Sequence, residues 1–168
     1  MNYKEQLLTE HSRTNTDFIA QAIGNKPAEL QKIIDIIYLQ PAPLPQRASW
    51  LLSVVNSRHP QLLTPHIPLF IRTVHHFHID GIRRNIMHVL AQHTIPEQQQ
   101  ATLLDICFHF LLSPTETVAV KVHAMKVIAN LSRLHPEIKG ELRSVIQQQL
   151  PKNTVAFAAR ARLILKKL

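Results

Sequence analysis

The chain has 168 residues, of which 45% are hydrophobic and only three are glycine, so it can bury a core and favours helices over glycine-rich turns. Its formal net charge of +8 would attract phosphates or acidic partners. No apolar run approaches the roughly 20 residues that span a bilayer, and residues 1–8 lack the apolar core of a signal peptide. We therefore expect a cytoplasmic protein without a membrane partner, and its single cysteine, Cys107, fits that reducing compartment.

The first forty residues predict three helices. Residues 3–9 could form a short leading helix, and residues 14–23 carry the apolar pattern of a second one, with Asn15 or Thr16 as its cap. A third helix should begin at Pro27, because a proline in the first turn has no N–H that would need a partner.

The most informative stretch begins at Asp80, which we expect to cap a helix because its carboxylate can accept hydrogen bonds from the first turn. Four apolar residues then recur at the i, i+4, i+7, i+8 spacing of an amphipathic helix. They are Ile82, Ile86, Val89 and Leu90.

The same register occurs before and after this stretch. Arg47, Arg83 and Lys121 occupy matching positions, 36 and 38 residues apart (83 − 47 and 121 − 83). A second series has a similar period, since each predicted second helix follows one of three prolines, Pro60, Pro96 and Pro136. Paired helices that repeat at this period indicate an α-solenoid.

These residues resemble a known family. The segments Ile82-Arg83-x-x-Ile86 and Val120-Lys121-x-x-Ala124 are similar to the Val-Arg-x-x-Ala core of HEAT repeats, and the run from Arg47 to Trp50 is similar to small bacterial HEAT-like proteins. The resemblance implies an all-α fold, a right-handed α-α superhelix of the HEAT/armadillo type. It also implies scaffolding and binding rather than catalysis.

The predicted organisation is a single HEAT-like domain, residues 1–168, with about four helical hairpins and a C-terminal capping helix. The approximate repeats are 14–40, 45–76, 79–113 and 115–150, and the capping helix is 154–168. Trp50 lies on the apolar stripe of its helix, which predicts a core position. The capping helix should present a polar outer surface, built from Arg160, Arg162, Lys166 and Lys167.

The residues that could carry chemistry do not form a recognisable site. His75 and His76 are adjacent, so on a helix they diverge by about 100° and cannot easily share a metal ion. Cys107 and His109 point in different directions, and apolar neighbours of Cys107 suppress its reactivity. No pair of carboxylates stands out, and three glycines cannot form a phosphate-binding loop. We therefore predict no catalytic residue, no cofactor and no metal.

Basic residues remain as candidates for binding. The column Arg47, Arg83 and Lys121 predicts ion pairs or carbonyl contacts between neighbouring repeats, with a strip that follows a phosphate backbone as the alternative. Second helices line the concave side in HEAT-like stacks, which points to Arg72, Lys139 and Arg143. The full candidate partner surface is Arg72, His76, Arg83, Arg84, Lys139 and Arg143.

The leading functional hypothesis is a non-catalytic scaffold that presents a concave helical surface to a protein or peptide. Its preorganised surface would lose little ordering entropy on binding. The alternative is a nucleic-acid-binding helical-repeat protein with a basic concave face, whose affinity would fall steeply with salt. A less favoured alternative is a DNA-repair-type enzyme, which requires a pocket with an acidic residue beside an aromatic one.

Overall fold

The computed structural model describes all 168 residues. It contains ten α-helices, four short 3₁₀ segments and no β-strand, which confirms the prediction of an all-α fold. The α-helices are α1 (Tyr3–Thr9), α2 (Arg13–Ile23), α3 (Pro27–Leu39), α4 (Leu44–Arg58), α5 (Ile67–Thr73), α6 (Asp80–Leu90), α7 (Glu97–Leu112), α8 (Val118–Leu131), α9 (Ile138–Gln149) and α10 (Val155–Leu165). None of these helices is long and apolar enough to cross a membrane.

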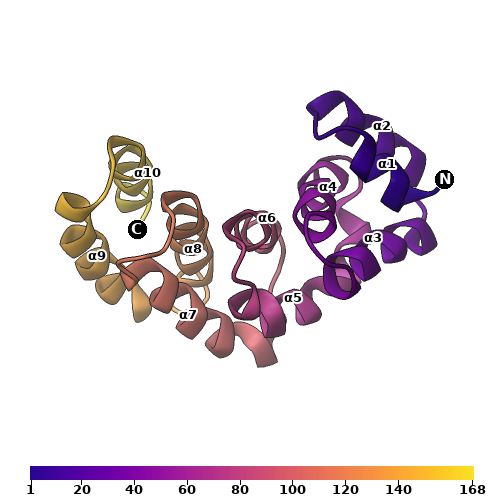
Figure 1. Cartoon of the computed structure of the whole chain (residues 1–168). Coiled ribbons are helices and arrows are strands. Elements are labelled where there is room, and N and C mark those ends of the chain that lie inside the picture. Colours follow the sequence, from indigo (N-terminus) through magenta and orange to yellow (C-terminus); the bar gives the residue numbers. More distant parts are fainter. The chain divides into compact units, whose positions relative to one another are not determined.

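The chain divides into two compact units, Met1–Val89 and Leu90–Leu168. The first unit holds α1 to α5 and all of α6 except its last residue, and the second holds α7 to α10. Within each unit the helices form two layers (Figure 1). One layer contains the first helices of successive hairpins, where α2 packs against α4 and α8 packs against α10. The other contains the second helices, where α7 packs against α9.

Local sequence signals place most helix starts well but misplace two caps. Helix α3 begins at Pro27, as predicted. The expected cap of α2 at Asn15 or Thr16 is wrong, because Ser12 is the N-cap and its Oγ accepts from the Asn15 N–H at 3.1 Å. Asp80 is likewise not a cap: it is the first residue of α6, and the carbonyl of Ile79 accepts the first hydrogen bonds of that helix.

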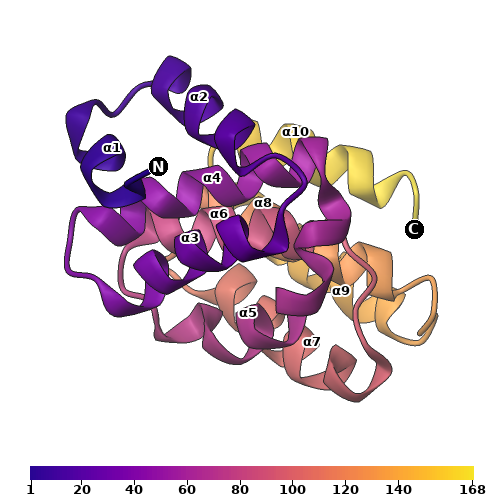
Figure 2. The same ribbon diagram turned by 90° about the vertical axis from the view of Figure 1, so that its right-hand side faces the viewer.

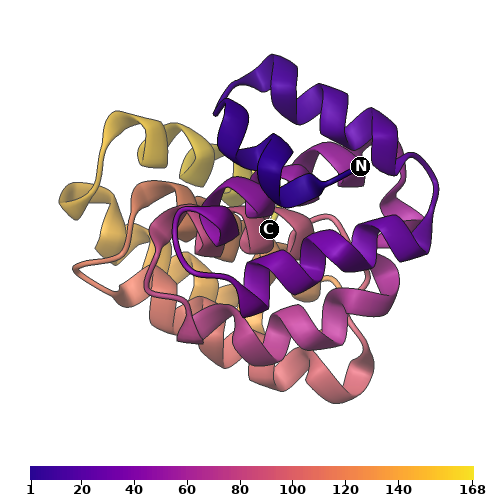
Figure 3. The ribbon, with the colours of Figure 1, turned by 45° about the vertical axis from the view of Figure 1, so that its right-hand side comes forward.

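The core of the first unit lies between its two layers. Helix α4 packs against α2 and α3, and the short α1 packs against α2, α3 and α4 (Figure 3). The fully buried side chains are large and aliphatic, as the apolar stripes of these helices require. They include Ile19, Ile23, Leu30, Ile33, Leu51 and Leu52.

Trp50 does not belong to this core. The predicted core position is wrong, because Trp50 is partly exposed and the rings of Trp50 and His11 meet edge to face, with centroids 5.4 Å apart. The corresponding residue one repeat later, Ile86, is fully buried. On α4 it is the next residue, Leu51, that is fully buried.

The core of the second unit is carried by α7, α8 and α9, and α10 closes one side of it. Phe110, Leu111 and Phe157 are buried there. Helix α7 is less enclosed than its apolar composition suggests, because Leu112 at its end is 45% exposed. An apolar residue on a helix therefore indicates burial here only when it faces a neighbouring helix.

Side-chain hydrogen bonds join residues one repeat apart, in both units. In the first unit, Gln61 Nε2 donates to Asn25 Oδ1 at 2.9 Å, and the buried Asn85 Nδ2 donates to Ser49 Oγ at 2.9 Å; each pair is 36 residues apart. In the second unit, Asn130 Nδ2 donates to the Ala91 carbonyl 39 residues away at 3.0 Å. Each module is therefore fastened to its neighbour in the chain, as expected of a repeat protein.

Candidate binding surfaces

The predicted basic column begins with Arg47 on α4. Its Nη1 donates to the carbonyls of Leu7 and Leu8, at 2.8 and 3.3 Å. These carbonyls lie in the last turn of α1, where no further backbone N–H is available to them and the helix dipole is negative. Arg47 therefore fixes the short α1 to the first hairpins through contacts to backbone oxygens.

Lys121 occupies the third position of the column and is 96% buried, with a relative exposure of 4%. Its Nζ donates to Asn153 Oδ1 at 3.3 Å, and Asn153 Nδ2 in turn donates to the Gln149 carbonyl at 2.8 Å. Burial lowers the pKa of Lys121, and the nearby carboxylate of Glu116 opposes that effect. The ammonium group thus joins α8 to the segment that precedes α10.

Arg83, the middle member, forms an ion pair with Asp80 one turn earlier on α6. The side chains of Arg47 and Lys121 thus contact oxygens of another module, as predicted for this column. The ion pair of Arg83 lies within its own helix. Spacing predicts the position of each of these side chains but not the group that it reaches.

The residues proposed as a partner surface lie at three places. Arg72 lies in the last turn of α5 and His76 four residues later, at the end of the 3₁₀ segment Val74–His76, and both are exposed. Arg84 is exposed on α6, next to Arg83.

Lys139 and Arg143 are also one turn apart, on α9 in the second unit. The Nζ of Lys139 donates to the Leu168 carbonyl at 3.3 Å, whereas Arg143 is exposed. Lys139 and Arg143 thus form one short group of candidates on α9 of the second unit.

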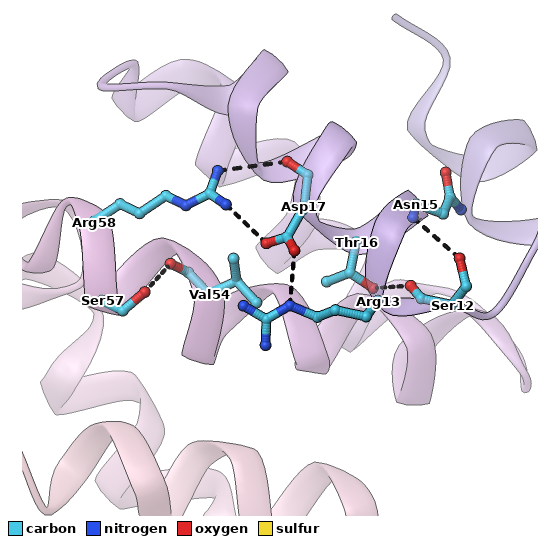
Figure 4. A network of polar contacts seen from close by, with 8 residues as sticks. All are labelled: Ser12, Arg13, Asn15, Thr16, Asp17, Val54, Ser57 and Arg58. Atoms are coloured by element: carbon cyan, nitrogen blue, oxygen red, sulfur yellow. Dashed lines mark hydrogen bonds and ion pairs between the residues drawn. The ribbon is translucent and has the colours of Figure 1, made fainter.

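A polar network that the sequence did not reveal joins α2 to α4 (Figure 4). Asp17 accepts from Arg13 Nε at 2.8 Å and from Arg58 Nη2 at 2.7 Å, and Arg58 also donates to the Asp17 carbonyl. The hydrogen bond from Arg13, with the nearby charge of Arg58, lowers the pKa of Asp17. One carboxylate thus holds two guanidinium groups from different modules.

The histidines do not gather into a metal site. The rings of His75 and His76 lie with centroids 3.9 Å apart, and no group of three or more His, Cys, Asp or Glu side chains is arranged to hold a metal ion. Burial, with the charge of His76, lowers the pKa of His75. His135 instead shares a hydrogen bond of 2.7 Å with Gln100, 35 residues away, and so contributes to the contacts between modules.

Cys107 lies on α7, and its side chain is fully buried. Burial raises the pKa of its thiol far above the usual range, because a thiolate would lose its hydration there. The thiolate is the nucleophilic form of cysteine, so Cys107 lacks the electropositive, accessible surroundings of a reactive one.

The exposed surface of α10 is more apolar than the sequence analysis predicts. The basic residues of this helix predict a polar outer surface, yet its exposed face also contains Val155 and Leu163. The signal was available in the helical spacing, but only the packing of α10 on α8 shows which side of the helix remains open.

Comparison with known proteins supports the repeat architecture. A family model described as a HEAT repeat domain matches residues 3–168, which is almost the whole chain. No curated protein and no solved structure matched the sequence. The match covers both units and all ten helices, in agreement with the repeat-spaced contacts within each unit. The chain belongs to the HEAT repeat domain family.

Proposed function

We propose that this protein is a non-catalytic scaffold that binds a protein or peptide partner through exposed faces of its helices. The observation that carries the proposal is the separation of its polar groups into two sets. Buried polar side chains such as Asn85, Gln100 and Lys121 bond to other segments of the chain. Exposed cations such as Arg84 and Arg143 remain available to a partner.

A catalytic role receives less support from the same residues. A repair-type site would need an acidic residue beside an aromatic one, but the ring that meets Trp50 is His11. Cys107 is buried in its neutral form. A scaffold needs none of these groups, because its contribution is a rigid surface that loses little entropy on binding.

Nucleic-acid binding is the second candidate, because the positive charge is concentrated near the C-terminal end of the sequence. The segment 142–168 has six Lys and Arg side chains and no Asp or Glu. Such a surface could neutralise phosphates, and its affinity would then fall steeply as salt increases.

Site-specific photo-crosslinking in the native cell tests the proposed function. A photoreactive amino acid would replace Arg72, Arg84, Arg143 or Leu163 in turn, with exposed Leu39 as a further position for comparison. We expect defined protein adducts at one or more positions. Each captured protein would then be purified and titrated against the wild-type chain, and binding should saturate.

Nucleic-acid adducts, together with a gel shift that weakens with salt, would replace the scaffold proposal by the second candidate. Captured proteins that fail to bind when purified would overturn the proposal.

A further inference from the structure

The positive charge of the second unit is concentrated on its last elements. Residues 142–168 contain no Asp or Glu, and their six cations account for most of the formal net charge of +8. The cations are Arg143, Lys152, Arg160, Arg162, Lys166 and Lys167. All six are exposed, and the ion pairs of the chain involve other residues. Their charge is therefore not neutralised within the protein.

Helix α10 lies at the margin of the second unit, where it packs against α8 (Figures 1 and 2). Phe157 and Ala161, one turn apart, are its fully buried residues and define the face that meets the core. Thr154 caps the helix, since its Oγ accepts from the Phe157 N–H at 3.3 Å. The orientation of α10 about its own axis is thus fixed by a cap and by a buried anchor.

The opposite face of α10 carries an apolar stripe. At 100° per residue, Ala156, Ala159 and Leu163 lie together on this face, and Val155 lies beside it, at the same edge of the helix as Arg162. Val155 is 85% exposed and Leu163 is 52% exposed. The two alanines between them leave room for the side chains of another helix, which packs best where small residues form a groove between larger ones.

Cations border this stripe on both sides. Arg162 lies at one edge of α10 and Arg160 at the other, and the two rows continue just past the last helical residue, Leu165, with Lys166 and Lys167 respectively. An apolar strip between two basic rows matches an amphipathic helix whose own apolar strip lies between two acidic rows. Such a partner would bury Leu163 and pair the cations at the same time.

We propose that the outer face of α10 binds an acidic amphipathic helix supplied by a protein partner. The inference rests on the proposed scaffold function and names the chemistry of the partner for one surface. A second copy of this chain is a poor occupant, because two such faces would place four cations against four. The face is also poorly suited to nucleic acid: its centre is apolar, and it has no aromatic side chain on which bases could stack.

The test is a titration of the full chain with a fluorescent, side-chain-stapled helix of about 15 residues, somewhat longer than α10. The probe carries leucines on one face and glutamates on both flanks. One comparison probe replaces the glutamates with lysines, and another replaces the leucines with serines. We expect saturable binding of the acidic amphipathic probe, and binding at least about tenfold weaker for both comparison probes.

Two variants locate the binding site. Arg162→Glu/Lys166→Glu reverses one basic row, and Leu163→Ser interrupts the stripe; both changes fall on exposed positions that the core does not need. Each should weaken the acidic probe by about tenfold or more. The matched controls change other exposed residues: Lys4→Glu/Lys26→Glu alters the net charge equally, and Leu39→Ser removes an exposed leucine in the first unit. Both controls should bind as the wild type does.

Reversal of all four cations, Arg160→Glu/Arg162→Glu/Lys166→Glu/Lys167→Glu, should switch the preference to the lysine probe. The inference is overturned if the acidic probe does not bind, or if Lys4→Glu/Lys26→Glu weakens it as much as Arg162→Glu/Lys166→Glu does. It is also overturned if vesicles of phosphatidylserine and phosphatidylcholine, or a DNA duplex, bind this face and displace the probe. Protein adducts that form only at Arg72 or Arg84 would leave the scaffold proposal standing while this inference fails.

Discussion

Replacement of Phe157 by alanine tests whether the modules of this protein are coupled only to their neighbours. The Phe157 side chain is fully buried, and it is the largest anchor of α10 on α8. Burial of an aromatic side chain of about 150–250 Å² at about 25 cal/mol per Å² corresponds to about 4–6 kcal/mol. The measured range for such truncations is about 3–5 kcal/mol. A helix of 11 residues is marginal without packing, so α10 should detach and unfold.

Hydrogen exchange measured by mass spectrometry would locate the effect. We expect rapid exchange in α10, partial loss of protection in α8, and little change in α2, α3 and α4 of the first unit. Leu163→Ala is the control on the same helix, because Leu163 is half exposed and its truncation should cost less than about 0.5 kcal/mol. Protection lost equally in both units would show one cooperative core and would refute the nearest-neighbour reasoning. Unchanged protection of α10 would show that Phe157 does not anchor it.

Three further predictions concern the ionic contacts between modules. Arg47→Met removes the donor to the Leu7 and Leu8 carbonyls, so α1 should lose about 1.5–3 kcal/mol of local stability. The backbone amides of α1 should then exchange hydrogen faster, and unchanged amide exchange in α1 would contradict this role. Because its contact with Arg13 lowers the pKa of Asp17, the contribution of this carboxylate is fully present above its unfolded pKa of about 3.9 and is lost as the pH falls through the folded value. The difference in melting temperature between the wild type and Asp17→Asn should therefore be largest near neutral pH and vanish in acid; a constant difference would argue against it. Burial lowers the pKa of Lys121 below its unfolded value of 10.5. At pH values between the folded and the unfolded pKa, the folded state binds fewer protons than the unfolded state, so the free energy of unfolding rises with pH there. Lys121→Met should abolish this rise in denaturant titrations, and an identical rise in the variant would assign it to another group.

Local sequence signals determined the helices and their repetition. The leading helix at residues 3–9 and the start of α3 at Pro27 follow from short-range chemistry, since apolar spacing and a proline act within one or two turns. The 36- and 38-residue spacings likewise match the sequence separation between residues that form hydrogen bonds from one module to the next, as Ser49 and Asn85 do. These features depend on neighbours in the chain and are therefore visible in the sequence.

The predicted cap at Asn15 is wrong because groups outside the first turn of α2 compete for its side chain. Asn15 is a good capping residue by type, but its Nδ2 donates to the carbonyls of Gln6 and Glu10, and Gln6 Nε2 donates back to Asn15 Oδ1. Because Asn15 joins α1 to α2 in this way, Ser12 caps α2 instead. Which of several neighbouring polar residues caps α2 is thus decided by contacts with α1, which lie outside the few residues that a local capping rule considers.

The candidate surface was predictable in composition but not in geometry. The sequence by itself determined that α10 would carry cations and an apolar side, since both follow from its residue types and helical period. Only the tertiary structure decided which apolar residues stay uncovered: α8 takes Phe157 and Ala161 and leaves Val155 and Leu163 outside. The physical reason is that the burial of a side chain depends on both surfaces that come into contact. The spacing of residues along one helix describes only one of those surfaces and does not identify the other.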